Sequence, residues 1–216
     1  ETSAGAANFI FDEVAKVTSI DDELALQAVD SLVSLGEPGL NAARYALAST
    51  RAPVMMTSLR VLLRGGKASD ADLVVARVRQ RMPAKAAPSA LGELIERDPV
   101  RATPRFLCEM LSHPQSPVRA VAQRSLAEET DASLLPLLVP ALRSRTADTR
   151  LRAVELLLNI DDPAVLELLL ERLDDSRAKV ASRALHGIAA SEDPRVEVAL
   201  RTRAFRERWI LRSSAY

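Results

Sequence analysis

The stretch VRAVAQRSL, residues 118–126, carries the pattern that decides the fold. Its apolar residues Val118, Ala122 and Leu126 recur every four positions, which predicts one face of an α-helix. A shift of 31 residues places TRLRAVELL (149–157) on the same pattern, and a second shift places VASRALHGI (180–188) on it. Such a fixed period is the sequence signature of a protein built by stacking one structural unit.

A second helix follows each first helix in the same register. Its apolar columns are Leu134, Leu138 and Leu142, then Val165, Leu169 and Leu173, then Val196, Leu200 and Ala204. One aspartate stands between the two helices of every repeat, at Asp131, Asp162 and Asp193. Each repeat is therefore predicted to consist of a helix A, a short turn and a helix B.

The pattern extends toward the N-terminus with looser spacing. Helical hairpins are predicted over about 22–49 and 51–82, after one leading helix at 6–18. The chain is thus expected to be all-α, an α-solenoid of about five to six antiparallel helix pairs.

We expect one solenoid domain over 1–216, with degenerate hairpins in 1–86 and regular repeats in 87–212. The start without Met, and an A-helix pattern that opens again at 211–215, predict a fragment of a longer chain.

The paired acids of IDDPAVLELLLERLDDSR, residues 160–177, raise the question of a metal site. Asp162 and Asp174 stand at opposite ends of one predicted helix, about 18 Å apart at ~1.5 Å per residue. Two ligands at that distance cannot share one ion. We interpret the acids as helix caps and solvated turns.

The capping pattern recurs elsewhere in the chain. Aspartate before proline suits a helix start, because the carboxylate accepts from free N–H groups and proline lacks one. The predicted caps are Asp98-Pro99, Asp162-Pro163, Asp193-Pro194 and Ser116-Pro117, with acidic capping boxes at Ser19/Asp22 and Ser69/Asp72.

Composition agrees with closely packed helices. The chain is 48% apolar but only 3% aromatic, and its 7 glycines are too few for the turns of a many-stranded β fold. The single cysteine, Cys108, lies on a helical apolar face and is predicted to be a buried thiol. No apolar run reaches the ~18 residues of a membrane-spanning helix. We therefore expect no membrane insertion.

The A helices carry an Arg followed three residues later by Ala, at Arg119, Arg150 and Arg212, and this pattern with its turn aspartate resembles the HEAT repeat. LDDSRAKVASRALHGI (173–188) is the most typical stretch, although Ala181 replaces the usual Arg. The period is similar to the short bacterial form, the phycobilisome-lyase-type HEAT-like repeat. The resemblance is clearest over 113–212.

This resemblance implies a right-handed superhelix whose B helices line a concave surface that binds other proteins. The expected function is a non-catalytic scaffold or adaptor, with no cofactor and no metal. Charged B-helix positions opposite the apolar columns are the candidate contacts: Arg105, Glu109, Glu167, Glu171, Arg172 and Arg203.

Nucleic-acid binding is the alternative, as in HEAT-like DNA glycosylases that use a cationic groove. Residues 51–112 carry 11 bases and 6 acids, against 2 bases and 8 acids in residues 1–50. The candidate basic patch is Arg60, Arg64, Arg77, Arg81 and Arg206. A net charge of zero and one late Trp depart from a basic stripe interleaved with aromatics.

The two histidines, His113 and His186, share no catalytic motif with each other or with Cys108, and no phosphate-binding glycine loop is present. We therefore expect no enzyme. A bilin-lyase role would rest on the repeat type alone.

The apolar residues Phe205, Trp209 and Leu211 suggest self-association through the C-terminal end. The Arg- and Ala-rich composition and the repeat length predict a bacterial cytoplasmic protein, and a signal peptide upstream of residue 1 remains compatible with the sequence.

Overall fold

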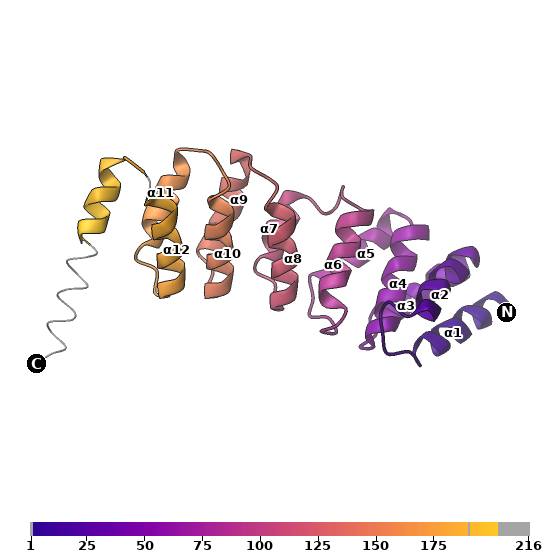
Figure 1. The fold of residues 1–216 in the computed structure, drawn as a ribbon. Helices are drawn as coiled ribbons and strands as arrows, with labels where there is room; N and C mark the ends of the chain where they lie inside the picture. The colour runs from indigo at the N-terminus through magenta and orange to yellow at the C-terminus, as the bar shows by residue number, and fades with distance from the viewer. Residues whose placement is uncertain (1, 190, 203–216) are drawn as a thin grey trace, which may run out of the picture. The chain divides into compact units, whose positions relative to one another are not determined.

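The computed structural model describes residues 2–189 and 191–202 of the chain (Figure 1). These residues form helices and no strand, so the predicted all-α class is confirmed. A final helical segment covers residues 194–202. The helices before it are α1 (Thr2–Val14), α2 (Glu23–Ser34), α3 (Glu37–Ala46), α4 (Ala52–Gly65), α5 (Ala68–Val78), α6 (Ala87–Arg97), α7 (Pro104–Met110), α8 (Ser116–Leu126), the 3-10 turn η1 (Ala132–Leu134), α9 (Leu135–Leu142), α10 (Ala147–Leu157), α11 (Ala164–Arg172) and α12 (Ala178–Ile188).

The chain forms two compact units, Glu1–Leu126 and Ala127–Tyr216. In the first unit, the A helices α2, α4, α6 and α8 contact one another in that order. The B helices α3, α5 and α7 each pack against the A helix that follows. In the second unit α10 contacts α9 and α12, and α11 contacts α12.

This stacking of helix pairs on their neighbours is the packing of an α-solenoid. Five pairs lie within single units, and α8 and α9 follow each other along the chain. The predicted number of five to six pairs therefore agrees with the described helices.

The repeat register is confirmed by burial. The A-helix columns at 118, 122 and 126, at 149, 153 and 157, and at 180, 184 and 188 are all at most 1% exposed. The B-helix columns are also buried from Leu134 to Val196. These small and branched apolar side chains fill the space between stacked helices, so the core runs through each unit as a continuous layer.

Several predicted caps are correct. Asp162 accepts from the Ala164 N–H at 2.8 Å, Asp193 from the Arg195 N–H at 2.8 Å, and Asp131 from the Ser133 N–H at 2.7 Å. The pKa of Asp193 falls to about 2 because the Arg195 side chain and backbone both donate to its carboxylate.

Three other predicted caps are wrong. Asp98 ends α6 and accepts from Arg101, while Thr103 caps α7 by accepting from the Phe106 N–H. A non-helical turn at 98–103 therefore lies where Asp98-Pro99 was expected to begin a helix. The two boxes are also misplaced: Asp22 alone caps α2, and at the start of α5 the Lys67 N–H donates to the Asp70 carboxylate at 2.8 Å.

The leading helix occupies residues 2–14 rather than 6–18. On α2, the buried residues are Ala25, Ala28, Val29 and Leu32, whereas Leu24 is 40% exposed. Ala25 rather than Leu24 therefore belongs to the buried face of α2, which packs against α1 and α4.

Candidate functional site

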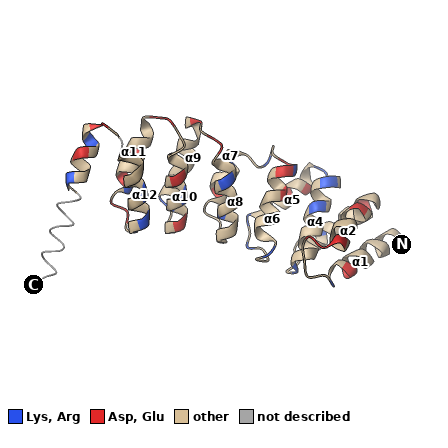
Figure 2. Ribbon diagram, in the orientation of Figure 1, with Lys and Arg blue, Asp and Glu red and all other residues tan. Residues whose placement is uncertain are grey.

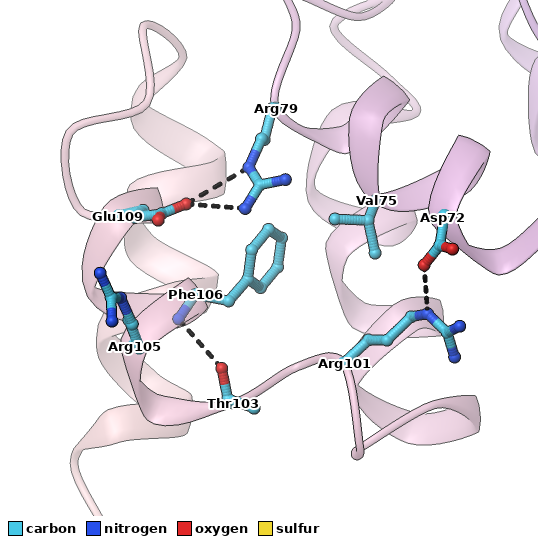
Figure 3. A pocket seen from close by; sticks show the side chains of 8 residues that line it. All are labelled: Asp72, Val75, Arg79, Arg101, Thr103, Arg105, Phe106 and Glu109. Atoms are coloured by element: carbon cyan, nitrogen blue, oxygen red, sulfur yellow. Dashed lines mark hydrogen bonds and ion pairs between the residues drawn. The ribbon is translucent and has the colours of Figure 1, made fainter. Parts of the chain in front are cut away.

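A hollow of about 240 Å³ opens between the B helices α5 and α7 in the first unit (Figure 3). Its lining comes from α5, from the end of the turn at 98–103, and from the first two turns of α7. Two predicted contact residues, Arg105 and Glu109, are part of that lining. The hollow therefore includes two of the residues that the resemblance made candidate partner contacts.

The floor of the hollow is aromatic. Phe106 is 4% exposed, and the guanidinium carbon of Arg79 lies 5.2 Å from the centre of its ring. Arg79 also donates to one carboxylate oxygen of Glu109, from Nη2 at 3.0 Å and from Nε at 3.3 Å. A cation over an aromatic face is stabilised by the ring quadrupole. This three-residue contact fixes the shape of one wall.

The opposite wall is held by a second ion pair. Arg101 donates to Asp72 at 2.8 Å and to Asp98 at 3.0 Å, which joins the turn before α7 to α5 (Figure 3). Arg105 is exposed, and among the described residues it has no ion-pair or hydrogen-bond partner. A cation without a partner beside an apolar floor can bind an incoming carboxylate.

The candidate contacts of the second unit lie on α11 and beyond it. Glu167 is exposed and pairs with Arg195, and Glu171 is exposed and pairs with Arg172 at 3.2 Å. Arg172 is half-buried, and its Nη1 donates to the Leu142 carbonyl at 2.8 Å. Arg172 therefore joins α11 to the end of α9. Arg203 lies outside the described residues.

Two members of the candidate basic patch, Arg60 and Arg64, are neutralised by acids. Arg60 is 7% exposed and donates to Glu93 at 2.6 Å, to Asp21 at 3.1 Å and to the Ile20 carbonyl at 2.7 Å. Arg64 pairs with Asp30. These side chains connect helices to one another, so the nucleic-acid alternative is not favoured.

The remaining members of that patch add one exposed cation. Arg77 donates to the backbone carbonyls of Leu47 and Arg81, both at 3.1 Å. Arg81 is exposed. Arg206 lies outside the described residues, as do Phe205, Trp209 and Leu211, the residues predicted to self-associate.

Arginine–carboxylate pairs that join repeats are a feature the sequence interpretation missed. Arg44 on α3 donates to both carboxylate oxygens of Asp70 on α5, at 2.6 and 2.9 Å, and the Lys67 N–H donates to the same group. These bonds hold the pKa of Asp70 below its usual range. The available signal was an Arg that recurs at about one repeat from an acid. The separation between the two is not fixed, because the pairs that join repeats range from 25 residues for Arg150–Asp175 to 39 for Arg60–Asp21.

The thiol of Cys108 is buried on α7, as predicted, and burial raises its pKa to about 11. His113 is also buried. Its Nδ1 accepts from the Gln115 N–H at 3.1 Å, so Nε2 carries the proton and donates to the Gln80 carbonyl at 3.0 Å. Both residues are structural parts of the first unit.

Among residues 2–189 and 191–202, no three His, Cys, Asp or Glu side chains come together as a metal site. Within the same residues no helix is long and apolar enough to cross a membrane.

Comparison with known proteins agrees with the repeat packing. The family model described as HEAT repeats matches residues 104–189, from α7 through α12. Residues 104–189, less than half of the chain, are therefore similar to HEAT repeats. HEAT repeats generally mediate protein–protein interactions and are typically non-catalytic.

Among solved structures, the chain is similar to the crystal structure of an engineered protein from the Northeast Structural Genomics Consortium. The two are 16% identical, with 91% of this chain and 86% of that chain covered and a TM-score of 0.32. That score is too low to add to the assignment. No curated protein matches the chain.

Proposed function

We propose that this chain is a non-catalytic scaffold that binds a partner protein on its B-helix surfaces. The observation that carries the proposal is the hollow between α5 and α7. There Arg105, which has no ion-pair partner among the described residues, stands beside the apolar floor made by Phe106. A partner segment with an acidic and an apolar side chain fits this lining. A bacterial, cytoplasmic adaptor is the setting that composition suggests.

A small anchoring site such as this hollow can supply much of the free energy of binding. A few buried aromatic and arginine contacts supply most of the binding free energy of a typical protein interface. Phe106 is held by Arg79, and the Arg79–Glu109 pair is about half exposed at both ends. The hollow is therefore pre-organised, which lowers the entropy lost on binding.

On the second unit, Glu167 and Glu171 are further contacts in this proposal, because both carboxylates are exposed on α11. Arg172 is a weaker candidate, since it already donates to the Leu142 carbonyl.

The test is a pull-down from native lysate with the purified chain as bait, with and without nuclease. Arg105→Glu is the site variant, and Arg81→Glu, exposed and outside the hollow, is the matched control. Protein retained after nuclease, lost with Arg105→Glu and kept with Arg81→Glu, is the expected result.

Two outcomes would overturn the proposal. If the Arg105→Glu and Glu109→Arg baits both still retain the partner protein, the hollow is not the binding site. If nuclease treatment and the Arg81→Glu change each abolish retention, the chain binds nucleic acid rather than a partner protein. Melting curves of each bait establish that the variants are folded.

A further inference from the structure

A second hollow, of about 180 Å³, lies between α1 and α2 in the first unit. Its walls include Phe9 and Ile10 from α1 and Leu24 and Ala28 from α2. Phe9 is 64% exposed and Leu24 is 40% exposed. The other large exposed apolar side chains among the described residues, such as Tyr45 and Val100, do not line this hollow.

The side chains of Phe9 and Leu24 therefore leave apolar surface in contact with water. Covering such area contributes about 25 cal/mol for each Å² removed from solvent. An occupant with one large apolar side chain therefore fits between α1 and α2.

The helices α1 and α2 and the turn between them, which border this hollow, carry acidic residues (Figure 2), and Glu13 is the acid among the lining residues. Residues 2–34 contain six acids, Asp12, Glu13, Asp21, Asp22, Glu23 and Asp30, and one base, Lys16, a net charge of −5. Arg60, Arg64 and Lys16 pair with Asp21, Asp30 and Glu13 respectively. Asp12 and Glu23 have no cationic partner among the described residues. A basic occupant would be attracted to this border.

The chain contains a segment with the complementary chemistry. Residues 203–216, RAFRERWILRSSAY, lie outside the described part of the chain. Four arginines and one glutamate give this segment a net charge of +3. It also carries Phe205, Ile210, Leu211 and Trp209, the one tryptophan of the chain.

We propose that residues 203–216 of one copy dock in the α1–α2 hollow of a second copy, with an apolar side chain between Phe9 and Leu24 and arginines against the acidic border. This is a head-to-tail contact, in which different surfaces of the two copies meet. It is independent of the partner proposed for the α5–α7 hollow.

Trp209 makes the contact measurable without a label. The experiment is sedimentation velocity of the whole chain over an about hundredfold range of concentration, with tryptophan emission recorded on the same samples. The average mass is expected to rise with concentration while the emission shifts to the blue. Added salt should reverse both changes, since exposed charge pairs are screened.

Phe9→Glu is the test variant, and Tyr45→Glu, an 87% exposed aromatic outside the hollow, is its control. Phe9→Glu should weaken association about tenfold or more, which corresponds to ~1.4 kcal/mol. Tyr45→Glu should associate like the unmodified chain. Leu24→Lys provides a second variant in case Phe9→Glu does not fold.

Three results would each overturn the proposal. The first is a single-copy mass at every concentration. The second is association that survives both Phe9→Glu and Leu24→Lys. The third is Trp209 emission that depends on Phe9 in a chain of single-copy mass, which would place the contact within one molecule.

Discussion

Arg150 on α10 donates two hydrogen bonds to Asp175, from Nε to Oδ2 and from Nη2 to Oδ1, both at 2.7 Å. The side chains are only 10% and 4% exposed. Asp175 also accepts from the Arg177 N–H at the start of α12, and Arg150 donates to the Ser144 carbonyl. One ion pair therefore fixes the starts of two successive A helices.

Loss of this pair should destabilise the second unit. Asp175→Ala leaves the Arg150 guanidinium buried without its partner, and we expect a loss of about 3–5 kcal/mol. Arg150→Lys should give a smaller loss, because lysine keeps the charge but not the two-donor fork. Urea unfolding followed by helical circular dichroism measures both. The control is Asp161→Ala, in an exposed turn; equal losses for Asp161→Ala and Asp175→Ala would contradict the role of the pair.

Acid should weaken the first unit through Asp70. Hydrogen bonds from Arg44 and from the Lys67 N–H lower the pKa of Asp70 from its ordinary value of 3.8. A lowered folded-state pKa gives stability that is fully present above that ordinary value and is lost as the pH falls through the folded-state pKa.

Asp70→Asn should therefore reduce the free energy of unfolding at neutral pH. It should also make the loss of stability below pH 3.8 less steep. Denaturant midpoints at a series of pH values measure this, with exposed Asp12→Asn as the control. If acid lowers the denaturant midpoint as steeply in Asp70→Asn as in the unmodified chain, Asp70 is not the source of the acid sensitivity.

Replacing Gly39 with alanine should lower the stability of the first unit, and replacing Gly92 with alanine should raise it. A Cβ on Gly39 would lie 2.0 Å from the Leu32 backbone oxygen, whereas a Cβ on Gly92 would have nothing within 4 Å. Gly39→Ala should cost about 1–3 kcal/mol, because the backbone of α2 cannot rotate out of the way. Gly92→Ala should add about 0.5–1 kcal/mol through helix propensity. Thermal unfolding of the two variants compares them; two shifts of the same sign would refute the close approach of α3 to α2.

The repeat register predicts a contrast between two alanines of the second unit. Ala153 is fully buried, and Ala178 is exposed in the first turn of α12. Ala153→Asp should destabilise by about 3 kcal/mol or more, because it places an unpaired charge in the helix contact. Ala178→Asp should be tolerated, since an acid near a helix N-terminus is favourable. An unchanged melting curve for Ala153→Asp would contradict the register.

Periodicity was enough to predict the helices and most of the core, because the A columns from Val118 to Ile188 repeat without a gap. It was less informative in the first unit. On α4, residues from Val54 to Leu62 are buried on every side, and these include polar Thr57, Ser58 and Arg60. A helix covered all round has no single apolar stripe to read.

The ion pairs could not be read from local sequence. Asp175 was interpreted as part of a solvated turn, yet its carboxylate is buried against an arginine 25 residues earlier. The hollow between α5 and α7 likewise depends on Arg79 and Phe106, which come from different repeats. Helical spacing alone was enough to place Arg105 and Glu109 on an exposed face of helix B, and their contact with a partner stays a prediction.

The buried thiol of Cys108 gives the first unit an intrinsic chemical reporter of its fluctuations. With a pKa of about 11 and 5% exposure, the thiol is both protonated and shielded at neutral pH. A thiol reagent can modify it only in the fraction of molecules where the packing around α7 has opened, so the reaction rate follows the population of that open state. A protein bound across the α5–α7 hollow would lower that population. Slower modification in a crude mixture would then reveal binding before the partner had been purified.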